Sequence, residues 1–257
     1  MDSRAWWNPM TIGYSTRFQQ VEAVNAYETG EYAPGSYSSH IWSLQRPVVE
    51  GILNDFRRNH PGALRLLDFA CGTGRVLAIL ENFADPAEGI DISENMVAVA
   101  RAKCTRARLH VGDILADPGL LAGQFDVITC FRFLLNVEST IRQRVLTRLR
   151  EVLRPGGLLL VNVHGSSRSV RHPAILWRRW RNHNPDSMLN EMPPAEAERL
   201  LWNSGFKIVR KFGFGLLPPT LYRTPLRGMA YAGDRLFAGE NLFKGISIDL
   251  LYVCQPR

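Results

Sequence analysis

The sequence has few cysteines and no paired cysteine motif. Its four cysteines, Cys71, Cys104, Cys130 and Cys254, lie far apart, with no Cys-x-x-Cys pair among them. This spacing excludes a zinc finger and a disulfide scaffold, and it is typical of a protein from a reducing compartment. We therefore expect no bound metal and a cytoplasmic location.

Long hydrophobic runs are also missing. No stretch approaches the ~18 uninterrupted apolar residues that a transmembrane helix requires. The first ten residues, MDSRAWWNPM, lack the basic start and the apolar run of a secretory signal. With 257 residues, of which 46% are hydrophobic, the chain is long enough to form one large domain with a buried core.

The excess of positive charge is confined to the C-terminal third. Residues 165–257 contain 14 lysines and arginines against 7 acidic residues, whereas residues 1–164 contain 17 of each. The net charge of +7 therefore lies beyond residue 164. Such an excess attracts an anionic substrate, a phospholipid surface or a nucleic acid. A solvated surface without a partner is the alternative that the charge count leaves open.

Short apolar runs alternate with longer amphipathic ones along the chain. The expected strands are 63–70, 87–92, 107–113, 125–131, 157–164, 206–214 and 246–254. The expected helices between them are 74–83, 93–104, 139–153, 194–204 and a segment near 221–238. This alternation predicts an α/β fold with a doubly wound, mostly parallel sheet and helices on both faces.

The segment LLDFACGTGR (66–75) joins the first expected strand to the following helix. Asp68 lies in the strand, and Gly72 and Gly74 lie in the turn after it. Glycines allow a sharp turn and a close approach of a ligand to the backbone. In a doubly wound sheet, ligands bind at the carboxyl ends of the strands, which is where this loop lies.

Two acids after the next strands indicate a nucleoside ligand. Asp91 follows Gly74 by 17 residues, where a carboxylate accepts hydrogen bonds from ribose hydroxyls, and Asp113 is placed to meet an adenine amino group. Residues 75–77 lack the third glycine of the dinucleotide motif. Asp68 disfavours a neighbouring pyrophosphate and favours a cationic group. S-adenosylmethionine (SAM) fits these features, and NAD does not.

The series LLDFACGTGR, GIDIS, VGD, FDVITC and LRPGG resembles the motifs of class I SAM-dependent methyltransferases, in their order and spacing, over roughly residues 60–165. The resemblance implies a seven-stranded sheet of order 3-2-1-4-5-7-6 with the last strand antiparallel. It implies SAM as the cofactor and S-adenosylhomocysteine as the product. It also divides the single domain into an N-terminal lid segment (1–60), a SAM-binding core (61–164) and an acceptor-side insertion with the final strands (165–257).

The resemblance assigns the cofactor contacts as well. It places the glycine loop at the methionine part of SAM, Asp91 at the ribose, and Ile92 and Met96 on the adenine. The expected cofactor-binding residues are Arg46, Asp68, Ala70, Gly72, Thr73, Gly74, Asp91, Ile92, Met96, Asp113, Ile114 and Phe131. Arg46 is similar in position to an arginine that meets the SAM carboxylate in ubiquinone-biosynthesis-like O-methyltransferases; an ordinary surface arginine is the alternative.

The acceptor is expected to meet residues outside the glycine loop. The expected acceptor-binding residues are Tyr32, Tyr37, Trp42, Arg132 and Arg178. An aromatic lid of this kind excludes water, although the same side chains also suit packing on the sheet edge. His40 and His164 are the candidate catalytic bases, because an imidazole with a near-neutral pKa suits a hydroxyl acceptor. A structural role for each histidine is the alternative.

Two segments bear on the class of acceptor. Residues 130–133 read Cys-Phe-Arg-Phe, whereas nucleic-acid amino-methyltransferases resemble one another in an Asn/Asp-Pro-Pro-aromatic motif there, so we expect no nucleic-acid substrate. Residues 171–183 combine arginines with Trp177 and Trp180, a pattern that suits an anionic bilayer, a phosphorylated or lipid-linked acceptor, or a cap on the pocket. A solvated helix with inward-packed tryptophans is equally consistent.

The sequence thus predicts a SAM-dependent methyltransferase for a small or lipid-linked acceptor, most simply a hydroxyl of a natural product or cell-envelope metabolite. The alternatives are an RNA or protein methyltransferase, favoured only by the C-terminal charge, and a non-catalytic SAM-binding partner subunit. Peripheral contact with a membrane through residues 171–183 is part of the first hypothesis. The oligomeric state is not determined by the sequence.

Overall fold

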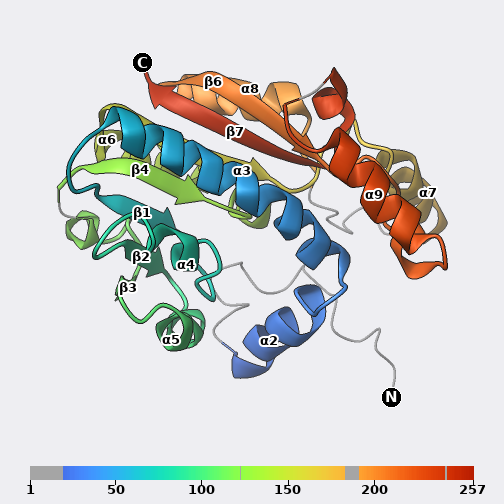
Figure 1. Ribbon diagram of the computed structural model, residues 1–257, viewed down its shortest axis with the longest axis horizontal. Coiled ribbons are helices and arrows are strands. Elements are labelled where there is room, and N and C mark those ends of the chain that lie inside the picture. The colour runs from blue at the N-terminus through green and yellow to red at the C-terminus, as the bar shows by residue number, and fades with distance from the viewer. Residues whose placement is uncertain (1–19, 122, 183–190, 241) are drawn as a thin grey trace.

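The computed structural model describes residues 20–121, 123–182, 191–240 and 242–257. Its centre is a seven-stranded sheet with helices on both faces (Figure 1). In chain order, the strands are β1 (Leu66–Phe69), β2 (Glu88–Asp91), β3 (Arg108–Val111), β4 (Phe125–Cys130), β5 (Leu153–Val163), β6 (Phe206–Phe214) and β7 (Asp249–Pro256).

The strand order is β3-β2-β1-β4-β5-β7-β6, which confirms the expected order. Strands β1 to β5 pair in parallel, and β7 runs antiparallel to both of its neighbours, as expected for the last strand. The carboxyl ends of β1, β2, β4 and β5 therefore meet along one edge of the sheet. This edge carries the glycine loop and the residues that follow each strand.

Helices form a layer on each face of the sheet. The main helices are α2 (Val21–Ala26), α3 (Tyr37–Asn59), α4 (Leu77–Leu80), α5 (Glu94–Lys103), α6 (Ser139–Glu151), α7 (His172–Asn182), α8 (Pro194–Asn203) and α9 (Arg227–Phe237). A π-helical turn, η1 (Tyr27–Glu31), follows α2, and short 3₁₀ turns are η2 (Pro118–Leu120), η3 (Leu134–Asn136), η4 (Leu221–Arg223) and η5 (Leu242–Ile246). Among the described residues, no helix combines the length and the apolar character that crossing a bilayer requires.

Two hydrophobic clusters join these layers to the sheet. On one face, Val49 and Leu53 of α3 pack with Leu66 and Leu80, and all four side chains are completely buried. On the other face, the cluster contains residues of α6 and α8, such as Leu149 and Leu201, together with Ile128 of β4. Because successive residues of a strand point to opposite faces, Val127 belongs to the first cluster and Ile128 to the second.

Several element boundaries differ from the sequence prediction, and three of them show why. The helix expected at 74–83 is only α4 (Leu77–Leu80), because positive φ angles at Gly72 and Gly74 keep the loop non-helical and i→i+3 bonds tighten the chain after Ile79. The segment near 221–238 divides into η4 and α9. Strand β5 already begins at Leu153, which pairs with Phe125 before the expected start at 157.

Candidate functional site

The glycine loop after β1 is tied directly to Asp91 at the end of β2. Ala70, Gly72 and Gly74 have φ angles of 55°, 53° and 80°, so the chain turns through left-handed backbone at three points. The Asp91 carboxylate accepts hydrogen bonds from the backbone N–H of Gly72 and of Ser93, each at 2.9 Å. Burial raises the pKa of Asp91 although these two donors oppose the shift. Loop and acid are thus fixed relative to one another before any ligand binds.

A cavity of about 440 Å³ opens beside this loop, and we call it the larger cavity. Its lining residues are Phe69, Ala70, Ile90, Asp91, Ile92, Gly112, Asp113, Ile114, Leu115, Ala116, Phe133, Val137, Glu138, Ile141, Arg144 and Val145. Five residues expected to contact the cofactor, Ala70, Asp91, Ile92, Asp113 and Ile114, are among them. Sequence analysis missed the wall formed by α6 and the residues that flank η3, because nothing in the sequence distinguishes it from an ordinary amphipathic helix.

The other residues expected to contact the cofactor are not among those that line this cavity. Asp68 is buried and accepts a hydrogen bond from the Thr129 hydroxyl at 2.6 Å. Burial raises the pKa of Asp68 to about 7. Thr73 and Met96 are buried as well, and the backbone N–H of Met96 donates to Ser93 Oγ at 3.2 Å. Gly72 leaves open space where a Cβ would stand, with no described atom within 4 Å, so the backbone is accessible to a ligand.

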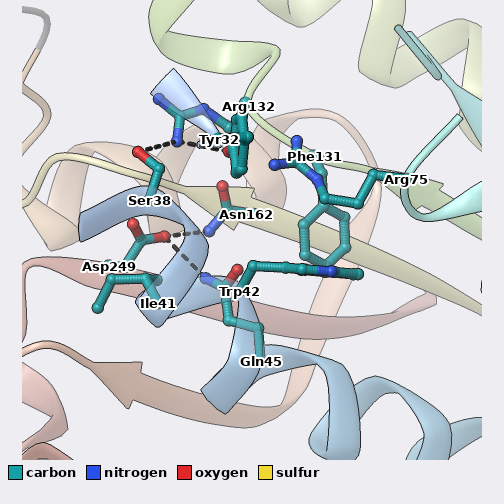
Figure 2. A pocket seen from close by; sticks show the side chains of 10 residues that line it. All are labelled: Tyr32, Ser38, Ile41, Trp42, Gln45, Arg75, Phe131, Arg132, Asn162 and Asp249. Atoms are coloured by element: carbon teal, nitrogen blue, oxygen red, sulfur yellow. Dashed lines mark hydrogen bonds between the residues drawn. The ribbon is translucent and has the colours of Figure 1, made fainter. Parts of the chain in front are cut away.

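A second cavity, which we call the polar cavity, has a volume of only about 10 Å³ (Figure 2). The linker after β4 contributes to both, since Phe131 and Arg132 line the polar cavity and Phe133 lines the larger one. The complete polar lining is Tyr32, Ser38, Ile41, Trp42, Gln45, Arg75, Phe131, Arg132, Asn162 and Asp249. The structure thus brings together four expected site residues, Tyr32, Trp42, Phe131 and Arg132, from segments up to 100 positions apart.

One wall of the polar cavity is a buried carboxylate, Asp249 at the start of β7. Its Oδ1 accepts hydrogen bonds from Gln45 Nε2 at 3.0 Å and from Asn162 Nδ2 (Figure 2). Burial raises the pKa of Asp249 to about 6, against the opposing effects of Arg132 and the two amide donors. Sequence analysis missed Asp249 and Asn162. The available signal was a single polar residue inside each apolar strand, LLLVNV and IDLLYV.

Two half-buried arginines, Arg75 and Arg132, also line this cavity, and they differ in how far their guanidinium donors find acceptors. The Arg132 guanidinium donates to Tyr32 Oη at 2.7 Å and pairs with Glu31. The Arg75 guanidinium stacks 3.3 Å from the centre of the Tyr32 ring, and its Nη2 donates to Tyr27 Oη at 3.0 Å. Nε and Nη1 of Arg75 are buried with no acceptor among the described residues. Arg75 therefore has two donors left for an anionic group.

Other expected site residues lie outside both cavities. Arg46 is 58% exposed and pairs with Glu50 one helical turn later, at 2.8 Å. Tyr37 packs against Tyr222, with ring centres 5.2 Å apart. The side chain of Arg178 lies outside the described part of the chain. Arg75, which directly follows Gly74 in the sequence, lines the polar cavity, and Arg46 does not.

The two candidate bases also lie away from these linings. His40 Nε2 lies 3.3 Å from Asp234 Oδ2, and His40 borders a third cavity of about 430 Å³ between α3 and α9. His164 follows β5, and its Nδ1 is buried without a described partner. Burial and the charges of Arg132 and Arg171 hold the pKa of His164 well below its usual value, so its imidazole is neutral at physiological pH.

The family model described as a methyltransferase domain matches residues 42–211, about two thirds of the chain. The chain belongs to this methyltransferase family. The family and the motifs at the larger cavity together confirm SAM as the expected cofactor. Volume and lining also fit it, since pockets for such molecules range from about 300 to 1,000 Å³.

Individual relatives differ in what their names say they methylate. The chain is 31% identical over 142 residues to a demethylmenaquinone methyltransferase of Leptospira interrogans, which covers 52% of this chain and 55% of that protein. It is 40% identical over 105 residues to a dTDP-3-amino-3,6-dideoxy-alpha-D-glucopyranose N,N-dimethyltransferase of Streptomyces fradiae, with 37% and 40% covered. The chain therefore matches only about half the length of these curated relatives or less.

Among solved structures, the fold is similar to magnesium protoporphyrin IX methyltransferase from Synechocystis PCC 6803 with bound SAM. The TM-score is 0.59 at 16% identity, covering 95% of this chain and 98% of the other. At this identity the similarity concerns the fold, and it agrees with the strand order observed here.

Proposed function

We propose that this chain transfers the methyl group of SAM to a hydroxyl group of a small-molecule or lipid-linked acceptor. In this proposal, the larger cavity holds the adenosyl part, with Asp91 at the ribose hydroxyls and Asp113 and Ile114 around the adenine. The glycine loop and Asp68 lie on the methionine side. When bound, SAM supplies the methyl group and leaves as S-adenosylhomocysteine.

Arg75 is proposed as the residue that holds the SAM carboxylate. It directly follows the loop, and two of its guanidinium donors are buried without acceptors, which costs free energy unless an anion satisfies them. Arg46, the residue first expected in this role, is already paired and mostly exposed.

Replacing either arginine by methionine tests this assignment with a matched pair. We expect Arg75→Met to weaken SAM binding by at least about tenfold, since a hydrogen bond to a charged group contributes ~1.5–3 kcal/mol. Arg46→Met should leave the affinity unchanged. Calorimetric titration of both variants decides the matter: a loss with Arg46→Met alone would restore the earlier assignment.

The observation that carries the acceptor side is the buried carboxylate of Asp249 in the polar cavity, whose lining residues Phe131 and Arg132 directly precede Phe133 of the larger cavity. Its Oδ1 is occupied by two amide donors, and Oδ2 has no described donor, so Oδ2 is free to accept a proton. A base with a pKa of about 6 is ionised at neutral pH and still basic enough to assist a hydroxyl. The proton of the acceptor hydroxyl passes to Asp249 as the oxygen gains the methyl group.

His164 and His40 remain the alternative bases in this proposal. His164 has a neutral imidazole with an unpartnered nitrogen, and His40 is oriented by Asp234. The pH dependence of kcat in variants of the three candidate bases shows which of them accepts the proton. Asp249→Asn should abolish the acidic limb of kcat and lower kcat strongly, whereas His164→Gln and His40→Gln should change it little. The reverse pattern would move the role to a histidine.

The acceptor itself is best found by a methyl-transfer screen over phenols, polyketides, sugars and polyprenyl lipids, read by mass spectrometry. The products should carry the methyl group on oxygen. Transfer to an amine alone would contradict the hydroxyl proposal and bring the chain closer to the N,N-dimethyltransferases it is similar to. A steep loss of turnover with salt would instead favour a nucleic-acid substrate.

We also propose that α7 and the residues around it, 171–183, contact the acceptor or the membrane surface in which a lipid-linked acceptor lies. Trp177 and Trp180 are 53% and 77% exposed, and Ile175 alone of the neighbouring apolar side chains is buried. These tryptophans therefore do not pack inward, as the solvated-helix alternative required. Their exposure supports contact with an apolar or interfacial partner.

A further inference from the structure

A second group of exposed apolar side chains lies on α9 and η5. It consists of Leu226, Met229, Leu236, Phe237, Leu242, Phe243 and Ile246, and we call it the α9–η5 surface. Leu242 is 97% exposed, Leu236 80% and Met229 74%. The rings of Phe237 and Phe243 pack edge to face with centres 5.1 Å apart, so the two segments form one continuous surface. Figure 1 shows α9 at one end of the long axis of the molecule, outside the sheet.

The two sides of α9 have opposite roles. Ala230 and Asp234 are buried, and Asp234 bonds to His40, Tyr222 and the backbone of Leu216, which fixes the helix against α3. Leu226, Met229 and Leu236 are spaced so that they share another arc of the helix, and this arc faces solvent. A contiguous exposed apolar patch of this kind marks a site of interaction.

The charges around the α9–η5 surface are positive. Arg227, Arg235 and Lys244 belong to the same two segments, and no ion pair is recorded for any of them in the described chain. The acidic residues nearby have other partners: Asp234 is buried and bonds to His40 and Tyr222, and Glu240 pairs with Arg210 at 3.2 Å. Apolar anchors bordered by unpaired cations are the pattern of an interfacial helix on anionic lipid.

We propose that the α9–η5 surface docks this protein on the surface of an anionic lipid bilayer, with the apolar side chains in the interfacial layer and Arg227, Arg235 and Lys244 at the lipid headgroups. A second copy of the chain fits the surface less well, because a two-fold contact would bring the same three cations of each copy together. Docking by this surface is independent of the proposed methyl transfer and of the 171–183 segment, since neither contributes a residue to it.

Vesicle flotation with the full chain tests the proposal. The probes are vesicles of phosphatidylcholine alone and of phosphatidylcholine mixed with phosphatidylglycerol. We expect binding to the anionic vesicles that weakens with salt. Because burying one Leu or Met side chain changes a partition equilibrium by roughly tenfold, Met229→Ser/Leu236→Ser should reduce binding at least about tenfold. The double variant Arg227→Glu/Arg235→Glu should also reduce vesicle binding, and the reduction should be smaller on neutral than on anionic vesicles.

Matched controls keep the result specific. Trp202→Ser removes a 55% exposed apolar side chain from α8 and should leave vesicle binding unchanged. Unchanged calorimetric SAM binding by all variants establishes that they are folded and separates this result from the proposed function. The proposal is overturned if the wild type binds neither vesicle, if the Met229/Leu236 variant binds normally, if Trp180→Ser alone abolishes binding, or if the Met229/Leu236 variant loses only self-association.

Discussion

At the scale of single residues, two neighbouring carboxylates are held in different ways and respond differently to substitution and to pH. Asp91 reaches the wall of the larger cavity and accepts two backbone hydrogen bonds. Asp68 lies deeper, is buried, and accepts a hydrogen bond from Thr129. We therefore expect the first to contact a ligand directly and the second to act through its charge.

Asp91→Ala should weaken SAM binding by roughly one to two orders of magnitude. The substitution leaves two ribose hydroxyls without an acceptor, at ~1.5–3 kcal/mol per hydrogen bond to a charged group. Gly72→Val should weaken binding further, because it places a β-branched side chain at a φ of 53° and in the open space beside the loop. Calorimetric titration measures both. Wild-type affinity in both variants would contradict the cofactor assignment.

The raised pKa of Asp68 leads us to expect that SAM affinity depends on pH. Its pKa is raised to about 7 in the free protein, so it is largely protonated at acidic pH, and a cationic ligand group favours the ionised form. Affinity should therefore rise with pH and level off above the pKa, by up to about an order of magnitude between about pH 5.5 and 7.5. Asp68→Asn should bind more weakly and lose this dependence. A flat wild-type profile over that range would refute the role of Asp68.

At the scale of elements, the glycine loop depends on close packing against α5. A Cβ built on Gly74 would lie 2.8 Å from Cys104 Sγ and 3.1 Å from Ala100 Cβ, and the φ of 80° adds strain for any other residue. Cys104 Sγ also donates to the carbonyl of Gly74 at 3.3 Å. Loop, helix and the residue at the helix end therefore fit together only with glycine at this position.

Gly74→Ala should lower the free energy of unfolding by about 1–3 kcal/mol, through overpacking and strain together. Gly51→Ala provides the matched comparison. Gly51 lies exposed in α3 with no described atom within 4 Å of an added Cβ, so alanine should stabilise the helix by up to about 1 kcal/mol. Thermal or urea denaturation gives both values. Equal stability of the two variants would contradict the packing argument.

At the scale of the whole molecule, the charge is divided between the two ends of the chain. The SAM-binding core and the segment before it are neutral overall, and residues 165–257 carry the entire excess of +7. An uneven field of this kind concentrates anionic molecules on one side of a protein. The acceptor or a surface that carries it is the component expected to respond, because the SAM cavity is formed by residues of the neutral part.

Charge reversal of Arg178 and Arg179 to glutamate tests this division. We expect the KM for the acceptor to rise, or the part of liposome association that depends on α7 to be lost. SAM affinity should stay within about twofold, because neither arginine is among the residues that line the larger cavity and a surface charge contributes only ~0–1 kcal/mol. Steady-state kinetics at low salt and calorimetry give the two quantities. If turnover of the acceptor were unaffected, α7 would have no part in acceptor binding.

Much of the cofactor side followed from local sequence. The glycine loop, the position of Asp91 and the alternation of strands and helices depend on residues close together in the chain. The resemblance of these local motifs to the methyltransferase family implied the strand order and the five residues of the larger cavity. The N-cap of α5 is local in the same sense, since Ser93 accepts the N–H of Met96 three residues later.

The acceptor side was decided by tertiary structure. Arg75 next to Tyr32, Asn162 next to Asp249, and Gln45 on α3 are separated by up to about two hundred positions, and no local pattern pairs them. Such contacts depend on how α3 crosses the sheet and on the antiparallel insertion of β7 between β5 and β6. The sequence by itself determined the fold and the nucleoside-binding loop, because backbone conformation and hydrophobic period are local. Only the folded chain determined which charged side chains line the polar cavity, because burial and long-range pairing set their pKa values and decide which of their donors lack an acceptor.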